Sequence, residues 1–125
     1  MKIRIKGNSI RLRLTKSDVD RFDKEGMVEE RTDLGNVTFG YVLQRSNEVD
    51  QLTASFSDGK IIMYVPESWA QEWTTTDRVG FDSHVSLGNG VEGGLYLLLE
   101  KDFKCLDETV EDQSDNYDNP LANKA

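Results

Sequence analysis

The chain repeats its hydrophobic pattern at an interval of 51 residues, and this repeat constrains the fold more than any other feature. The segment KIRIKGNSIRLRLTKSDVDRF near the start aligns without a gap with TASFSDGKIIMYVPESWAQEW. Apolar residues coincide in nine pairs: Met1/Leu52, Ile3/Ala54, Ile5/Phe56, Ile10/Ile61, Leu12/Met63, Leu14/Val65, Val19/Ala70, Phe22/Trp73 and Val28/Val79. Because repeated segments fold as similar supersecondary units, we expect two equivalent repeats, about residues 1–46 and 51–103.

Each repeat predicts two strands, a short helix and two more strands. Apolar and charged residues alternate over residues 1–6 and 10–14 around a Gly-Asn turn, which is the pattern of a β-hairpin. Thr15 is a favourable N-cap for a helix that Gly26 ends. The remaining expected elements are strands at 27–34, 37–44, 52–56, 61–65, 78–87 and 95–103, and a helix at 68–73 after Pro66.

Eight antiparallel strands are enough to close a small barrel, which leaves no exposed edge strands. Two stacked four-stranded sheets, one from each half of the chain, are the competing arrangement. The expected fold class is therefore α+β, mainly antiparallel β, with about eight strands in a barrel-like sheet and two short helices. Residues 1–106 form this single domain. Residues 107–125 contain six acids and almost no apolar side chains, so we expect a disordered acidic tail.

Charge and cysteine content limit the partners and the compartment. The net charge is −8 and the body outside the tail is also acidic, which argues against nucleic acid or an anionic membrane as a partner. The single Cys105 excludes an internal disulfide and suits a reducing compartment. With no signal-peptide pattern and no long apolar run, the cytoplasm is the expected location. The oligomeric state stays open.

The first hairpin gathers positive charge on one face. A Gly7-Asn8 loop places Arg4 opposite Arg11 and Lys2 opposite Arg13, with Lys6 at the same face. Like charges directly opposite each other are destabilising, and the second repeat is neutral at the equivalent positions. The candidate anion-binding residues, for a phosphate- or carboxylate-bearing ligand, are Lys2, Arg4, Lys6, Arg11 and Arg13.

Three explanations of this face remain open. Carboxylates from elsewhere could neutralise it, the candidates being Glu29, Glu30, Glu100 and the helix acids Asp18, Asp20 and Asp23. The face could bind an anion in a groove or a barrel lumen, where arginine binds phosphate or carboxylate with two hydrogen bonds. The acidic tail could also fold back onto it.

The sequence contains no recognisable catalytic or cofactor motif. His84 is the only histidine, two residues after Asp82, and a lone histidine is usually a surface residue. No Cys or His cluster has metal-ligand spacing, and the glycine-rich stretch 88–94 joins two strands, so it is no phosphate loop. Trp69 and Trp73 have the spacing of residues that pack in a core or under a lid, whereas an exposed pair would mark an interaction surface. We therefore expect a binding or interaction module without a cofactor.

Three resemblances extend this interpretation. The opening run MKIRIKGNSIRLRLTKSDVDRF resembles the start of the members of a small family of bacterial proteins of unknown function. This resemblance implies a match over nearly the whole body of the chain. The arrangement of strands and helices also resembles the CYTH-type triphosphate tunnel fold, whose first strand carries Glu-x-Glu-x-Lys and holds a divalent metal. Here the run is Lys2-x-Arg4-x-Lys6, so the two metal-binding acids are replaced by bases. This likeness implies phosphate contacts, and the alternative function is a phosphohydrolase with a degenerate metal site.

The third resemblance is to the swapped-hairpin DNA-binding modules of the AbrB type. The segment DGKIIMYVPESWAQEW is similar to their turn, strand and Pro-led helix. Those modules form dimers, which implies that a tandem copy could reproduce the dimer within one chain. The acidic body argues against DNA as the ligand.

Overall fold

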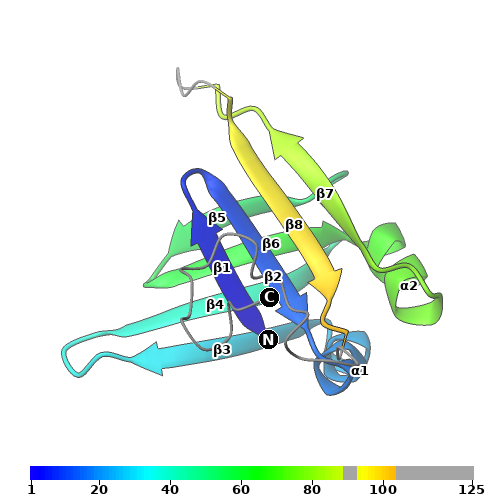
Figure 1. Cartoon of the computed structure of the whole chain (residues 1–125), viewed down its shortest axis with the longest axis horizontal. Helices are drawn as coiled ribbons and strands as arrows, with labels where there is room; N and C mark the ends of the chain where they lie inside the picture. Colours follow the sequence, from blue (N-terminus) through cyan, green and yellow to red (C-terminus); the bar gives the residue numbers. More distant parts are fainter. Residues whose placement is uncertain (89–92, 104–125) are drawn as a thin grey trace, which may run out of the picture.

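The computed structural model describes residues 1–88 and 93–103, and the expected order of strands and helices is confirmed (Figure 1). The predicted tail at 107–125 and most of the glycine-rich stretch lie outside the described residues. The elements are β1 (Lys2–Lys6), β2 (Ser9–Leu14), α1 (Lys16–Glu25), β3 (Met27–Asp33), β4 (Thr38–Ser46), β5 (Thr53–Ser57), β6 (Lys60–Pro66), α2 (Glu67–Thr75), β7 (Gly80–Val85) and β8 (Leu95–Lys101).

The strands form two four-stranded sheets. Sheet A has the order β1-β2-β8-β7 and sheet B the order β3-β4-β6-β5. The four hairpin pairs are antiparallel, whereas the central pairs β2/β8 and β4/β6 are parallel. Each sheet thus joins a hairpin from the first half of the chain to a hairpin from the second, so the alternative of one sheet from each half is wrong. The α+β, mostly antiparallel class is confirmed.

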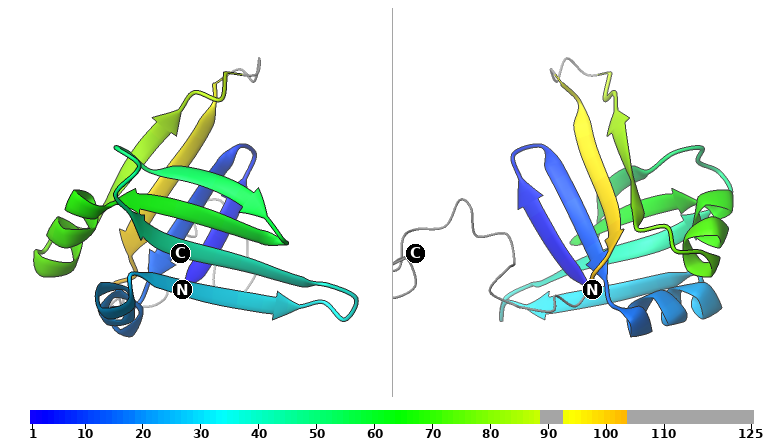
Figure 2. Two further views of the ribbon diagram at one scale, coloured as in Figure 1. Left: turned by 180° about the vertical axis from the view of Figure 1, so that it is seen from behind. Right: turned by 45° about the vertical axis from the view of Figure 1, so that its right-hand side comes forward.

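The two sheets pack face to face with their strands crossing steeply, and both helices lie at one end of the sandwich (Figures 1 and 2). The closed barrel that the strand count favoured is not confirmed. Within residues 1–88 and 93–103 the hydrogen-bonded ladders end at β1 and β7 in sheet A and at β3 and β5 in sheet B. The resemblance to the triphosphate tunnel fold, which was drawn from the arrangement of eight strands and two helices, is likewise not confirmed.

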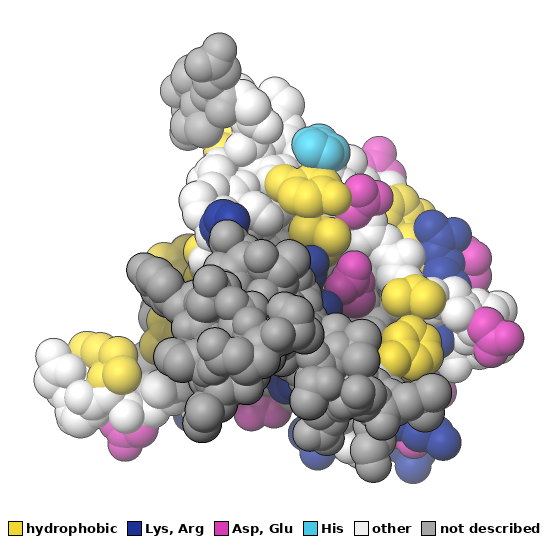
Figure 3. Space-filling view, viewed as in Figure 1, with side chains coloured by type: hydrophobic (Ala, Val, Ile, Leu, Met, Phe, Trp, Pro, Cys, Tyr) yellow, Lys and Arg dark blue, Asp and Glu magenta, His cyan; other side chains and the backbone are white. Residues whose placement is uncertain are grey.

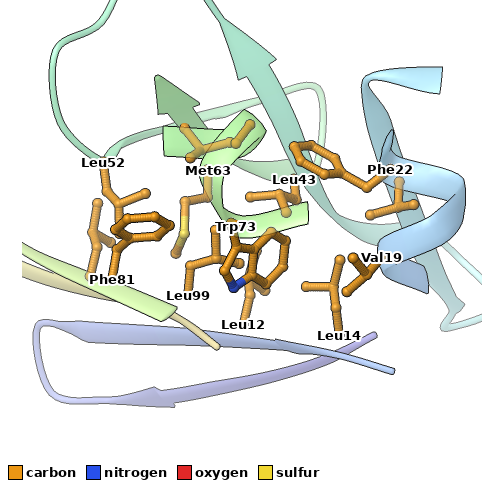
Figure 4. Close-up of a cluster of buried hydrophobic side chains, with 14 residues drawn as sticks. Leu12, Leu14, Val19, Phe22, Leu43, Leu52, Met63, Trp73, Phe81 and Leu99 are labelled. Carbon is orange, nitrogen blue, oxygen red and sulfur yellow. The ribbon is translucent and has the colours of Figure 1, made fainter. Parts of the chain in front are cut away.

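The core lies where the sheets cross and where the helices cover that crossing (Figure 4). Phe22 of α1 meets Trp73 of α2 edge to face, with ring centroids 6.0 Å apart, and both side chains are fully buried. Four pairs of the 51-residue repeat are buried in both members: Leu12/Met63, Leu14/Val65, Val19/Ala70 and Phe22/Trp73.

The pairing of Val28 with Val79 is wrong. Val28 is buried, but Val79 is 49% exposed and the buried side chain near the start of β7 is Phe81. One residue separates α1 from β3, whereas residues 76–79 separate α2 from β7, so the alignment at fixed spacing fails after the second helix.

The start of α1 is fixed by a buried carboxylate. Asp18 and Thr15 form a capping box, in which the Asp18 backbone N–H donates to Thr15 Oγ1 and the Thr15 N–H donates to Asp18 Oδ2. The Met1 ammonium also donates to Asp18 Oδ2 over 2.7 Å. Burial raises the pKa of Asp18, but these hydrogen bonds to the ionised form outweigh burial and leave the pKa below its ordinary value.

An Asp18→Asn variant should therefore be destabilised near neutral pH, by about 1–3 kcal/mol in the free energy of unfolding. When folding lowers the pKa of a carboxyl, the ionised carboxyl stabilises the folded protein fully at pH values above its unfolded-state pKa. This stabilisation is lost as the pH falls through the folded-state pKa. The difference between wild type and variant should accordingly shrink below about pH 4. Urea unfolding at several pH values measures this, with the exposed Asp20→Asn on the same helix as the control. A pH-independent difference would contradict the argument.

Candidate functional site

The predicted register of the first hairpin is confirmed. Arg4 pairs with Arg11, Lys2 with Arg13 and Lys6 with Ser9. The alternate residues Ile3 and Leu12 point into the sandwich core, so the cations lie on the outer face of sheet A. We call the five residues Lys2, Arg4, Lys6, Arg11 and Arg13 the basic face.

Two carboxylates offset part of this charge. Glu100 of β8 places Oε1 3.6 Å from the Nε atoms of both Arg11 and Arg13. Asp102, just after β8, lies 3.1 Å from Lys2 Nζ. Among the described residues, no carboxylate lies within 4.0 Å of the cationic nitrogens of Arg4 or Lys6, and both side chains are exposed. Within the described structure, the positive charge of the basic face is thus only partly neutralised.

The expected neutralisation by other acids is only partly right. Of the candidates, Glu100 reaches the basic face. Glu29 lies on sheet B, where hydrogen bonds from Arg31 and Lys60 hold the pKa of its carboxyl below the ordinary value. Glu30 and Asp18 instead bind the Met1 ammonium. These acids therefore serve other contacts.

The basic face is a surface and not the wall of a lumen. Four of its residues, together with Ile3, line one open depression, the four being Lys2, Arg4, Arg11 and Arg13. The side chains of Arg11 and Arg13 are 28% and 42% exposed. Both are less exposed than Lys2, whose side chain is 69% exposed. Lys2, Arg4, Arg11 and Arg13 are thus at least partly exposed to solvent in the described structure.

A group of polar rings continues the same outer face across β8 and β7. The register sets Tyr96 beside Ser9 and His84 beside Tyr96, and the two rings are 4.3 Å apart. The Tyr96 hydroxyl donates to Asp82 Oδ2 over 3.0 Å, and this hydrogen bond raises the pKa of Tyr96. Histidine, hydrophobic and acidic side chains gather over β7 and β8 in Figure 3, with Lys and Arg side chains beside them.

The sequence grouped Asp82 with His84 but missed Tyr96. Alternation along one strand reveals Asp82 and His84 as neighbours on a face, whereas Tyr96 comes from the paired strand and its hydroxyl is the group that Asp82 binds. The strand 95–103 was itself predicted, but the nine residues 86–94 between the two strands do not fix their register as a two-residue turn does, so the sequence did not indicate this contact. The expectation that Trp73 belongs to the core is confirmed, and Trp69 stacks on Phe81 with centroids 4.9 Å apart.

Metal-ligand clusters and membrane-spanning helices are both absent from the described residues. Within residues 1–88 and 93–103, no three His, Cys, Asp or Glu side chains come together in a way that could hold a metal ion. Neither helix of the described chain has the length and apolar character needed to cross a bilayer. The cytoplasmic location stays a prediction.

Comparison with known proteins places the chain in a family. Residues 1–121 match the sequence profile of a family of unknown function, DUF7009. The chain belongs to DUF7009. The DUF7009 match spans both halves of the fold and continues past the last described residue, Phe103, through most of the acidic segment. No curated protein and no solved structure matches the chain. The resemblance to an uncharacterised family is confirmed, and DUF7009 brings no activity with it.

Proposed function

We propose that this DUF7009 protein is a non-enzymatic binding module whose basic face takes up an anionic group, phosphate or carboxylate. One observation carries the proposal: Arg4 and Arg11 stand directly opposite each other on the exposed face, and Lys6 lies one step further along it. Directly opposed like charges cost about 0.2–1 kcal/mol per pair. A bound anion would neutralise these opposed charges and remove their mutual repulsion, which explains why the hairpin carries them.

The second hairpin supports this interpretation because it has the same pairing geometry with far less positive charge. In β5 and β6 the equivalent pairs are Thr53 with Tyr64, Ser55 with Ile62 and Ser57 with Lys60. Only one of these six side chains is cationic. The hairpin geometry therefore does not require a basic face, and the cations of β1 and β2 are a feature of that hairpin alone.

The spacing of the two arginines favours a ligand with several oxygens. Directly opposed residues in an antiparallel pair have Cβ atoms about 4.5–5.5 Å apart, so the guanidinium groups of Arg4 and Arg11 can converge on one tetrahedral phosphate or on neighbouring carboxylates. Each guanidinium offers a planar pair of donors, which matches such groups better than a lysine ammonium does. Lys6 and Lys2 then add charge at either end.

Thermal shift and calorimetric titration with inorganic phosphate, pyrophosphate, nucleotides and citrate test the proposal. At least one of these anions should raise the melting temperature, and an Arg4→Ala/Arg11→Ala variant should lose that effect. The control is Arg21→Ala/Lys24→Ala, which removes two exposed cations from α1 and changes the net charge equally. Without ligand, the hairpin variant should be as stable as wild type or slightly more stable, because the opposed pair is relieved. Equal anion responses in all three proteins would refute the proposal.

We further propose that the two halves are copies of one unit. Exchanging β1 with β5, β2 with β6, β3 with β7 and β4 with β8 turns the strand order of sheet A into that of sheet B read backwards. The buried pairs Leu12/Met63, Leu14/Val65 and Phe22/Trp73 occupy matched places under the same exchange. The exchange of hairpins between halves supports the likeness to swapped-hairpin dimers as an architectural one. The basic face is then a specialisation of one copy.

A further inference from the structure

We propose that the acidic segment 107–118 of the same chain binds to the basic face and competes there with external anions. This inference rests on the proposed function of the basic face. It follows from three properties of the described residues and the sequence: where the chain leaves the structure, how far the next residues can reach, and how the charges match.

The described chain leaves sheet A at the edge of the basic face. The last strand, β8, runs parallel to β2, and Lys101 pairs with Leu14 at their common end. The backbone N–H of Asp102 donates to Leu14 O over 2.8 Å, and its carboxylate lies 3.1 Å from Lys2 Nζ. Asp102 is thus already a contact between the C-terminal part of the chain and the basic face, and Phe103 is the last described residue.

The residues that follow are long enough to cover the face. An extended chain advances about 3.3 Å per residue, so the five residues from Asp102 to Asp107 span at most about 17 Å. The five-residue strand β1 has about the same length. An acid at or after position 107 can therefore approach any cation between Lys2 and Lys6, and the twelve residues 107–118 can run along β1 and return.

The charges are complementary and concentrated. The basic face holds five of the 15 Lys and Arg residues of the chain, against the two carboxylates of Glu100 and Asp102 in the described structure. Segment 107–118 holds no base and six acids, namely Asp107, Glu108, Glu111, Asp112, Asp115 and Asp118. The DUF7009 match extends to residue 121 and so includes all six acids.

A tethered acidic segment can occupy such a face although single exposed ion pairs are weak. Each pair contributes little in water, but the tether supplies the acids at an effective concentration in the millimolar range, and several pairs form at once. A free anion must then displace the segment. The apparent affinity for external anions is lowered accordingly, and salt weakens both interactions.

The experiment compares three full-length proteins. One is wild type. The second carries Asp→Asn and Glu→Gln substitutions at the six acids of segment 107–118. The third is a control with the same change in net charge, made at exposed acids elsewhere: Asp20, Asp23, Glu25, Glu48, Asp50 and Asp58. Two readouts are taken at low ionic strength: pyrophosphate affinity by calorimetry, and the backbone amide NMR shifts of β1 and β2 without ligand.

The segment variant should bind pyrophosphate about tenfold more tightly than the control, as expected for removal of a competitor at millimolar effective concentration. Its β1 and β2 amide signals should differ from those of wild type, whereas the control signals should not. Equal affinities in the segment variant and the control would overturn competition, and unmoved hairpin amides would overturn docking. If no variant binds pyrophosphate while the hairpin amides respond to the segment variant, the anion-binding function fails and docking of the segment stands.

Discussion

Replacing Trp73 by alanine is expected to lower the free energy of unfolding by about 3–5 kcal/mol. Trp73 is fully buried and is the largest side chain of the core. It meets Phe22 at 6.0 Å, and its indole N–H donates to Val79 O over 2.9 Å. Alanine would leave a cavity between α2 and both sheets and remove the contact that joins the two helices. Single domains are typically stable by only about 5–15 kcal/mol, so this loss is a large fraction of the total.

Urea unfolding followed by far-UV circular dichroism measures the effect. Trp73→Phe should lie between wild type and Trp73→Ala, because it retains a ring against Phe22 but loses the indole donor. Gln71→Ala on the exposed side of α2 should change stability by no more than about 0.5 kcal/mol. A Trp73→Ala variant as stable as the Gln71 variant would mean that the contact between the helices contributes nothing to the fold.

The sequence predicted those parts of the molecule that local rules determine. A two-residue loop fixes which residues of a hairpin oppose each other, so the register of Arg4 with Arg11 followed from the amino-acid sequence alone. A capping residue and a left-handed glycine fix the ends of a helix, and α1 runs between Thr15 and Gly26 as expected. These predictions depend on neighbours in sequence.

The sequence could not predict which hairpins share a sheet. The parallel pair β2/β8 joins the first hairpin to the last one, and no short-range rule selects that partner. The contacts of Glu100 with Arg11 and Arg13 depend on this pairing. The Tyr96–Asp82 hydrogen bond depends instead on the register of β7 with β8, which the long connection between these two strands leaves open. The sequence also could not show how far the two sheets overlap. Ile5 and Phe56 are 52% and 66% exposed, although the alternation of apolar residues predicted that they are buried. Crossed sheets bury only the region where they overlap, and both residues lie near the hairpin tips.

Gly80→Ala is the second substitution with a large expected effect, about 3 kcal/mol of stability or more. A Cβ atom at this position would lie 2.0 Å from the backbone oxygen of Leu99 and 2.9 Å from the Cα atom of Glu100. Both atoms belong to β8, which is held between β7 and β2 in the middle of sheet A. The clash is with backbone, so no side-chain rotation relieves it, and β7 must move away from β8. The hydrogen bond from Lys101 N–H to Val79 O, 2.9 Å long, lies next to the clash and should be lost first.

Gly40→Ala is a matched control because Gly40 is also a glycine within a strand. Its nearest neighbour to an added Cβ is Lys60 Cγ at 3.1 Å, an atom of a flexible side chain, and the closest backbone atom is Glu30 O at 3.4 Å. Alanine also restricts the unfolded chain more than glycine does, which offsets a small strain. Gly40→Ala should therefore cost no more than about 1 kcal/mol. Hydrogen exchange locates the damage, since Gly80→Ala should reduce the protection of β7 and β8 amides while those of β4 and β6 keep theirs. If both variants lost the same amount of stability, the close approach of β8 backbone to Gly80 would not be the reason why alanine is unfavourable at this position.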